Sequence, residues 1–180
     1  MMLAARLDQD ESLGDRVIKV DHAGEHGAIC IYRAQHWLAR WTAPAMRTEL
    51  DEFLEHERGH RALFGAELER RGRRRCRSYH LCGIGGFVLG TLTGLAGAGA
   101  IAATTVAIER VVLRHMHQQI AMLDGRDAAA VATLRAIVAE EQEHHDRSVD
   151  QLGKSRAWSA VIAPIVSAST EAVIWLGMRL

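Results

Sequence analysis

Glu57-Arg58-Gly59-His60 and Glu141-Gln142-Glu143-His144 are the two stretches of this 180-residue chain that decide its fold. Both read Glu-x-x-His, and positions i and i+3 of a helix project from the same side. Each stretch can therefore offer one carboxylate and one imidazole to a metal ion. The second pair follows the first by the same 84 residues, from 57 to 141 and from 60 to 144. A constant offset of this kind indicates a repeated helical unit.

A further glutamate stands 32 residues before each pair, Glu25 before Glu57 and Glu109 before Glu141, and both lie in apolar surroundings. The chain is therefore interpreted as two repeats, about 13–72 and 97–153, each with one Glu helix followed by one Glu-x-x-His helix. This is the ligand set of a dinuclear metal site inside a four-helix bundle. The six expected metal ligands are Glu25, Glu57, His60, Glu109, Glu141 and His144.

The residue types in this set suit iron or manganese, and four carboxylates balance the charge of two divalent ions. Without metal, the same cluster would carry a large electrostatic cost in a protein core. The alternative is that these are unrelated surface residues, because Glu and His are common on solvated helix faces.

The composition favours an all-α protein of one domain, 1–180. Hydrophobic residues make up 48% and charged residues 24%, which excludes a disordered chain, and only two prolines are present. Lys+Arg and Asp+Glu both number 22, which argues against a strongly basic nucleic-acid-binding protein. Three irregularly spaced cysteines argue against a disulfide framework and favour a reducing, cytoplasmic setting. The first twelve residues lack the apolar stretch of a secretory signal.

Local signals predict where the helices begin and end. The expected helices run from Ser12 or Asp15 to about Trp41, from about Ala45 to Arg71, from Asp127 to near Gly153, and roughly from Ala157 to Met178. A break is expected at Thr42-Ala43-Pro44, and Pro164 is expected either to bend the last helix or to delay its start.

The segment 81–108 contains no charged residue and follows an arginine-rich stretch, 70–77. A break is expected near Gly94–Gly99, because one helix from Cys82 to Leu123 would be about 60 Å long. Three interpretations remain open. The segment could span a membrane, form a closely packed helix pair through its glycines, or lie on a membrane surface with the arginines at anionic headgroups. The arginines could equally be a solvated helix end.

Other polar residues near the motifs are weaker candidates. Three carboxylates could orient the ligand histidines through their free ring nitrogens, or simply be surface charges: Asp21, Glu140 and Asp146. Four histidines flank the ligands but are expected to face elsewhere by helical phase: His22, His26, His56 and His145. Two more, His115 and His117, could face the mouth of the site.

Several of these segments resemble the Coq7 family, the demethoxyubiquinone hydroxylases of ubiquinone biosynthesis. They are residues 16–28, Ile31-Tyr32, Glu57-x-x-His60, residues 105–109, residues 140–146 and residues 171–176. The resemblance covers nearly the whole chain from Asp15 onward. It implies a ferritin-like four-helix bundle with additional apolar and C-terminal helices, and two iron ions held by the six expected ligands. One departure is Met116, because family members often have a tyrosine there.

The resemblance implies O2-dependent hydroxylation of the quinone ring of a demethoxyubiquinone, with electrons from NADH or another reductant. A polyprenyl quinone, O2 and the membrane surface are the expected partners, and the helices of 81–107 and 157–180 are candidates for the groove that holds the prenyl tail. Ubiquinone-biosynthesis proteins or further copies of this chain are candidate protein partners, and no nucleic acid is expected. The expected location is peripheral, on the cytoplasmic face of the cell membrane or, in a eukaryote, on the matrix face of the inner mitochondrial membrane.

Three other functions compete with this one. The first is another ferritin-like di-metal protein, such as a ferroxidase or a peroxidase-like protein, although these have no need of a long uncharged segment. The second is a di-iron hydroxylase acting on tRNA, suggested by the arginines but weakened by zero net charge. The third is a helical membrane-surface scaffold without metal.

Overall fold

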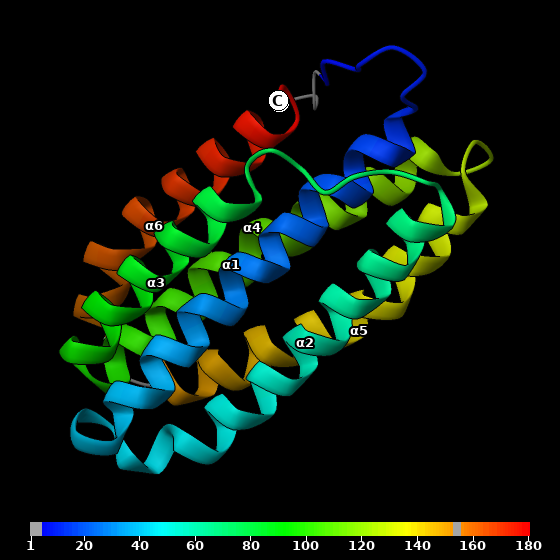
Figure 1. Cartoon of the computed structure of the whole chain (residues 1–180). Coiled ribbons are helices and arrows are strands. Elements are labelled where there is room, and N and C mark those ends of the chain that lie inside the picture. Colours follow the sequence, from blue (N-terminus) through cyan, green and yellow to red (C-terminus); the bar gives the residue numbers. More distant parts are fainter. Residues whose placement is uncertain (1–4, 153–155) are drawn as a thin grey trace.

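The computed structural model describes residues 5–152 and 156–180, and in those ranges it is helical without any strand (Figure 1). The helices are α1 (Leu13–Thr42), α2 (Arg47–Arg70), α3 (Tyr79–Ala96), α4 (Ala98–Leu123), α5 (Ala128–Leu152) and α6 (Arg156–Gly177). A single 3-10 turn, Pro44–Met46, joins α1 to α2. The predicted all-α class is confirmed.

The first helix begins where its sequence predicts. The Ser12 hydroxyl accepts a hydrogen bond from the Asp15 backbone N–H, and the Asp15 carboxylate accepts one from the Ser12 backbone N–H. The predicted break falls at Ala43, after which Pro44 starts the 3-10 turn. Gly72 follows the end of α2 with a φ of +62°, a conformation that glycine adopts without strain.

The other boundaries follow the same local chemistry. Gly97, with a φ of +90°, separates α3 from α4 inside the predicted 94–99 window. The Asp127 carboxylate accepts a hydrogen bond from the Ala130 backbone N–H and caps α5 as predicted. The predicted end of this helix at Gly153 lies outside the described residues. Pro164 stands inside α6, so the expectation that it could delay the start of this helix is wrong.

The helices form three layers of two helices each (Figure 1). α1 and α4 form the middle layer. α2 and α5 pack on one side of this layer, and α3 and α6 pack on the other. α1, α2, α4 and α5 make up the four-helix bundle, with α3 lying along α1 and α6 along α4. The predicted bundle with additional apolar helices is confirmed.

The glycines of α3 allow it to approach α1 very closely. A Cβ on Gly86 would lie 2.2 Å from the Gly27 carbonyl oxygen, and one on Gly90 would lie 2.4 Å from the Ile31 carbonyl oxygen. The glycine face of α3 is therefore part of a closely packed helix pair, as one of the three interpretations held. The partner of α3 in that pair is mainly α1.

The opposite faces of α3 and α6 are exposed and apolar. Both helices are long and apolar enough to cross a membrane by length and composition alone. Their exposed large apolar side chains are Leu81, Ile84, Phe87, Val88, Leu92 and Leu95 on α3, and Trp158, Val161, Ile165 and Trp175 on α6. A soluble monomer seldom exposes so large an apolar surface without a partner for it.

The arginine-rich stretch 70–77 divides into two groups. Arg71 forms ion pairs with Asp15 of α1, Glu67 of α2 and Asp127, so it links three helices of the bundle. Arg70 pairs with Glu67, and Arg73 pairs with Asp15. The remaining three, Arg74, Arg75 and Arg77, are exposed beside the start of α3.

Candidate metal centre

The six predicted ligands converge from all four helices of the bundle. Glu25 comes from α1, Glu57 and His60 from α2, Glu109 from α4, and Glu141 and His144 from α5. None of the six is more than 5% exposed. Because a carboxylate loses strong hydration on burial, four carboxylates in one core need compensating positive charge.

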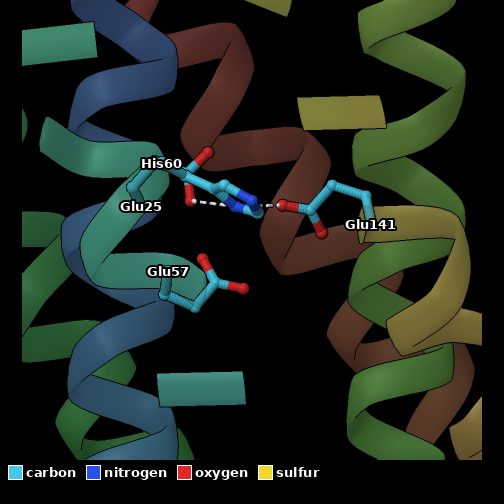
Figure 2. A group of neighbouring side chains, drawn as sticks. All are labelled: Glu25, Glu57, His60 and Glu141. Atoms are coloured by element: carbon cyan, nitrogen blue, oxygen red, sulfur yellow. Dashed lines mark ion pairs between the residues drawn. The ribbon is translucent and has the colours of Figure 1, made fainter. Parts of the chain in front are cut away.

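Two overlapping groups of side-chain atoms could each hold a metal ion. Within each group, one ligand atom per residue lies within 4.8 Å of all the others. The first group is Glu25, Glu57, His60 and Glu141, drawn in Figure 2, and the second is Glu57, Glu109, Glu141 and His144. Glu57 and Glu141 belong to both groups, so they have the placement of carboxylates that bridge two ions.

Both ligand histidines turn the same ring nitrogen toward the glutamates. Nδ1 of His60 lies 3.0 Å from a Glu141 oxygen and 3.8 Å from a Glu25 oxygen (Figure 2). Nδ1 of His144 lies 3.5 Å from a Glu57 oxygen and 3.7 Å from a Glu141 oxygen. Nδ1 is therefore the nitrogen available to a metal on each imidazole.

The pKa shifts in the cluster indicate which protons a bound metal would displace. Burial and the neighbouring carboxylates raise the pKa of Glu25 and Glu109 well above the ordinary value. Burial lowers the pKa of His144, but Glu141 and Glu57 outweigh burial and raise it to about 9. For Glu141, burial is outweighed by the neighbouring His144 and His60, which lower its pKa. Without a metal, these raised pKa values favour protons on Glu25, Glu109 and His144, and bound cations would balance the carboxylate charge in their place.

The residues fit a pair of metal ions. In the described part of the chain, four inward-facing atoms make no hydrogen bond: Oε1 of Glu57, Oε2 of Glu141, and Nδ1 of His60 and of His144. Buried polar atoms are nearly always paired, so four unpaired atoms on one cluster indicate a missing partner. Carboxylate oxygens and imidazole nitrogens are the donors that iron and manganese accept.

The outer ring nitrogens of the two histidines also have partners. Nε2 of His60 lies 2.9 Å from a Glu140 oxygen, so the predicted contact of Glu140 with a ligand histidine is confirmed. Nε2 of His144 lies 2.9 Å from Nδ1 of His56. The expectation that His56 faces elsewhere is therefore wrong, because its partner lies on α5 and helical phase within α2 does not reveal it.

The other two carboxylate candidates do not contact a ligand histidine. Asp146 is exposed and interacts with Gln142 and His145 of its own helix, so the orienting role considered for it is wrong. Asp21 accepts a hydrogen bond from the Gln119 amide at 3.0 Å instead.

The remaining histidines are turned away from the ligands, with one exception. His22 and His26 stack on Tyr79, and His145 contacts Asp146, as their helical phase predicted. The exception is His115, which lines the cavity described below while its Nε2 contacts Glu171. His117 contacts the Leu113 carbonyl of its own helix and is absent from that lining, so its predicted place at the mouth is wrong.

Tyr32 is a site residue to which sequence reasoning gave no role. Its hydroxyl donates a hydrogen bond to Oε1 of Glu109 at 2.9 Å, and the side chain is only 2% exposed. A signal was present, since Tyr32 follows Glu25 by two helical turns and so shares its face.

An apolar cavity of about 160 Å³ leads to the cluster from the side of α3 and α6. All four glutamates of the cluster contribute to its lining, together with Asp21 and Met116. The rest is mostly aliphatic and includes Ile31, Leu89, Ile108, Val112, Val173 and Ile174. The expectation that the helices of 81–107 and 157–180 border a groove beside the site is confirmed, and its occupant stays a prediction.

Comparison with known proteins places these features in a family. The family model described as "Ubiquinone biosynthesis protein COQ7" matches residues 12–177. Two relatives, from Mus musculus and Homo sapiens, are each named "NADPH-dependent 3-demethoxyubiquinone 3-hydroxylase, mitochondrial". The chain is 31% identical to each of them, over 92% of this chain and 77% of the relative. It is 33% identical to the 3-demethoxyubiquinol 3-hydroxylase of Rhodospirillum rubrum, over 97% of this chain and 83% of that protein. The chain therefore belongs to the COQ7 family of ubiquinone biosynthesis proteins.

Proposed function

We propose that this protein is a di-iron monooxygenase that hydroxylates the quinone ring of 3-demethoxyubiquinone or its quinol. The observation that carries the proposal is an apolar cavity whose lining includes the four buried glutamates of the cluster. The names of the relatives describe hydroxylation of this ring. An apolar ring and tail fit such a cavity, and a metal pair held by the glutamates could activate O2 beside the ring.

In this proposal Glu57 and Glu141 would contribute to both iron positions, Glu25 and His60 would hold one iron, and Glu109 and His144 would hold the other. When bound, the iron pair would supply the electrons and open coordination positions needed to activate O2. The glutamates hold the net charge of the centre near zero, because four carboxylates match two divalent ions. We also propose that 13–72 and 97–153 are related repeats within one domain, 1–180.

The chain itself binds and orients the substrate. The aliphatic walls of α3, α4 and α6 exclude water from the ring and offer about 0.8 kcal/mol for each CH2 of the tail that they bury. The Oδ2 atom of Asp21 is buried in this lining and has no hydrogen-bond partner among the described residues. Burial raises the pKa of Asp21 to about 7, so this atom can hold or release a proton beside the ring at neutral pH.

A reduced nicotinamide nucleotide is the proposed source of electrons, since several relatives are named NADPH-dependent. Met116 is buried in the cavity lining, where the family resemblance leads one to expect a tyrosine. A thioether has no hydroxyl to lose a proton and an electron. In this chain, therefore, the reductant does not act through a phenol at position 116.

The proposed location is peripheral, on the surface of the membrane that contains the quinone. Helices α3 and α6 lie together on one side of the molecule (Figure 1), and both carry exposed apolar side chains. α3 lies along α1 and α6 along α4, so a membrane crossing by either would bring the charged residues of the bundle into hydrocarbon. If α3 and α6 lie flat on the membrane surface, the charged residues stay in water and that cost is avoided. The face is the cytoplasmic one in a bacterium or the matrix one in mitochondria.

The test is the quinone profile of cells that lack this protein. We expect demethoxyubiquinone to accumulate, and the wild-type chain to restore ubiquinone. Glu109→Ala and His144→Ala should fail to do so, while Glu143→Ala, an exposed change on the same helix as His144, should succeed. Normal ubiquinone in cells without the protein would contradict the proposal.

A further inference from the structure

The residue directly before each Glu-x-x-His motif contacts the histidine of the other motif. His56 directly precedes Glu57, and Glu140 directly precedes Glu141, so the two occupy the same position in the two motifs. Glu140 reaches from α5 to His60 of α2, and His56 reaches from α2 to His144 of α5. The pairing is reciprocal, but one partner is a carboxylate and the other is an imidazole.

The two contacts have the same length, 2.9 Å, and both ligand histidines are buried. The rings of His56 and His144 are nearly parallel, with 8° between their planes and 5.2 Å between their centroids. Phe53 packs against the His144 ring at a centroid distance of 4.4 Å. His56 and Phe53 together hold the orientation of His144.

The chemical difference between His56 and Glu140 should change how strongly Nδ1 of each ligand histidine binds a metal. Nδ1 of each ligand histidine faces the glutamates, so with a metal on Nδ1 the ring proton would be on Nε2, which could donate it outward. His60 donates to a carboxylate, which strengthens the hydrogen bond and makes Nδ1 a better electron donor. Nε2 of His144 instead faces Nδ1 of an imidazole, which can accept a hydrogen bond but has no full negative charge to offer.

We infer that His56 is a positioning residue for His144 and that it makes the two metal positions unequal, with the His60 position binding metal more tightly. The inference rests on the two-metal centre proposed above and deepens it. The ligand types are matched on the two sides, so the positions differ in their hydrogen-bond partners: those of the outer ring nitrogens, and Tyr32 on Glu109.

The test is titration of the full-length, metal-free protein with Co2+, followed by visible absorption. The wild-type protein should take up two ions in two steps. His56→Ala should weaken the second step by about 10–100-fold and leave the first unchanged. His56→Glu, which copies Glu140, should tighten the second step toward the affinity of the first.

Glu140→Gln is the matched control, because it should weaken the first step and spare the second. Thermal unfolding of each metal-free variant shows whether the bundle is intact. If neither His56 substitution moves the second step, or if both steps move equally, the inference is overturned while the two-metal centre stands. A wild-type chain that binds fewer than two Co2+ would overturn the centre and the inference together.

Discussion

Asp21 carries a buried carboxyl whose ionisation should oppose folding. Its Oδ1 accepts the Gln119 amide, and burial raises its pKa from 3.8 to about 7. Below about pH 4 this carboxyl is protonated in both the folded and the unfolded chain, so it has no differential effect. Above about pH 7 it is charged in both, and only the folded chain bears the cost of a buried charge. Its unfavourable contribution therefore grows between these two pH values.

We predict that Asp21→Asn raises the free energy of unfolding of the metal-free protein by about 2–4 kcal/mol at pH 8 and by little at pH 4. Asparagine keeps an oxygen for Gln119 but cannot ionise. Denaturant unfolding at the two pH values measures the difference, with the exposed Asp150→Asn as the control. An equal gain at both pH values would show that ionisation of Asp21 is not the cause.

Tyr32 acts on the centre through Glu109, whose carboxylate it orients with a 2.9 Å hydrogen bond. Tyr32→Phe should lower the hydroxylation rate by about tenfold, the lower end of the range for removing a partner of a metal ligand. Thermal stability should change little, because the ring keeps its packing against Phe53. Turnover and melting temperature measured on the same preparations check this, and unchanged turnover would remove Tyr32 from the site.

The helices α3 and α1 pack backbone to backbone, and this contact sets the position of one cavity wall. Gly86→Ala and Gly90→Ala should each lower the free energy of unfolding by about 1–3 kcal/mol, because the new methyl group would overlap a carbonyl oxygen of α1. Gly85→Ala is the control, since nothing lies within 4 Å of a Cβ there. It should raise stability by up to about 1 kcal/mol through helix propensity. Chemical denaturation should separate the two sites, and equal effects would exclude close packing as the reason for the buried glycines.

Element boundaries were predictable from sequence because their causes are local. Ser12 and Asp127 cap their own helices, and Gly97 takes a backbone conformation that side chains disfavour. The convergence of the six expected ligands was predictable for a similar reason, since a repeated spacing places them on equivalent helix faces.

The contact of His56 with His144 was not predictable in the same way. It joins α2 to α5, and the phase of a residue on its own helix does not specify which side chain of a neighbouring helix it meets. Asp146 shows the converse case, because proximity in sequence to His144 did not bring it to the ring.

On the scale of the whole molecule, α3 and α6, with their exposed apolar side chains, lie on the opposite side from α2 and α5 (Figure 1). We predict that Phe87→Glu, on the exposed face of α3, weakens binding to anionic phospholipid vesicles by about tenfold or more, because it replaces an apolar contact with a charge. Leu63→Glu changes an exposed apolar residue of α2, on the other side, and should leave binding unchanged. Flotation assays compare the two, and an equal loss in both would contradict the proposed orientation.

The iron pair gives the four-helix bundle its proposed chemistry, and diffraction can locate it directly. Crystals of the protein loaded anaerobically with Fe2+ should show two anomalous peaks at the iron edge, one beside Nδ1 of His60 and one beside Nδ1 of His144, with Glu57 and Glu141 between them. A single peak, or peaks bound by residues outside the six, would contradict the account.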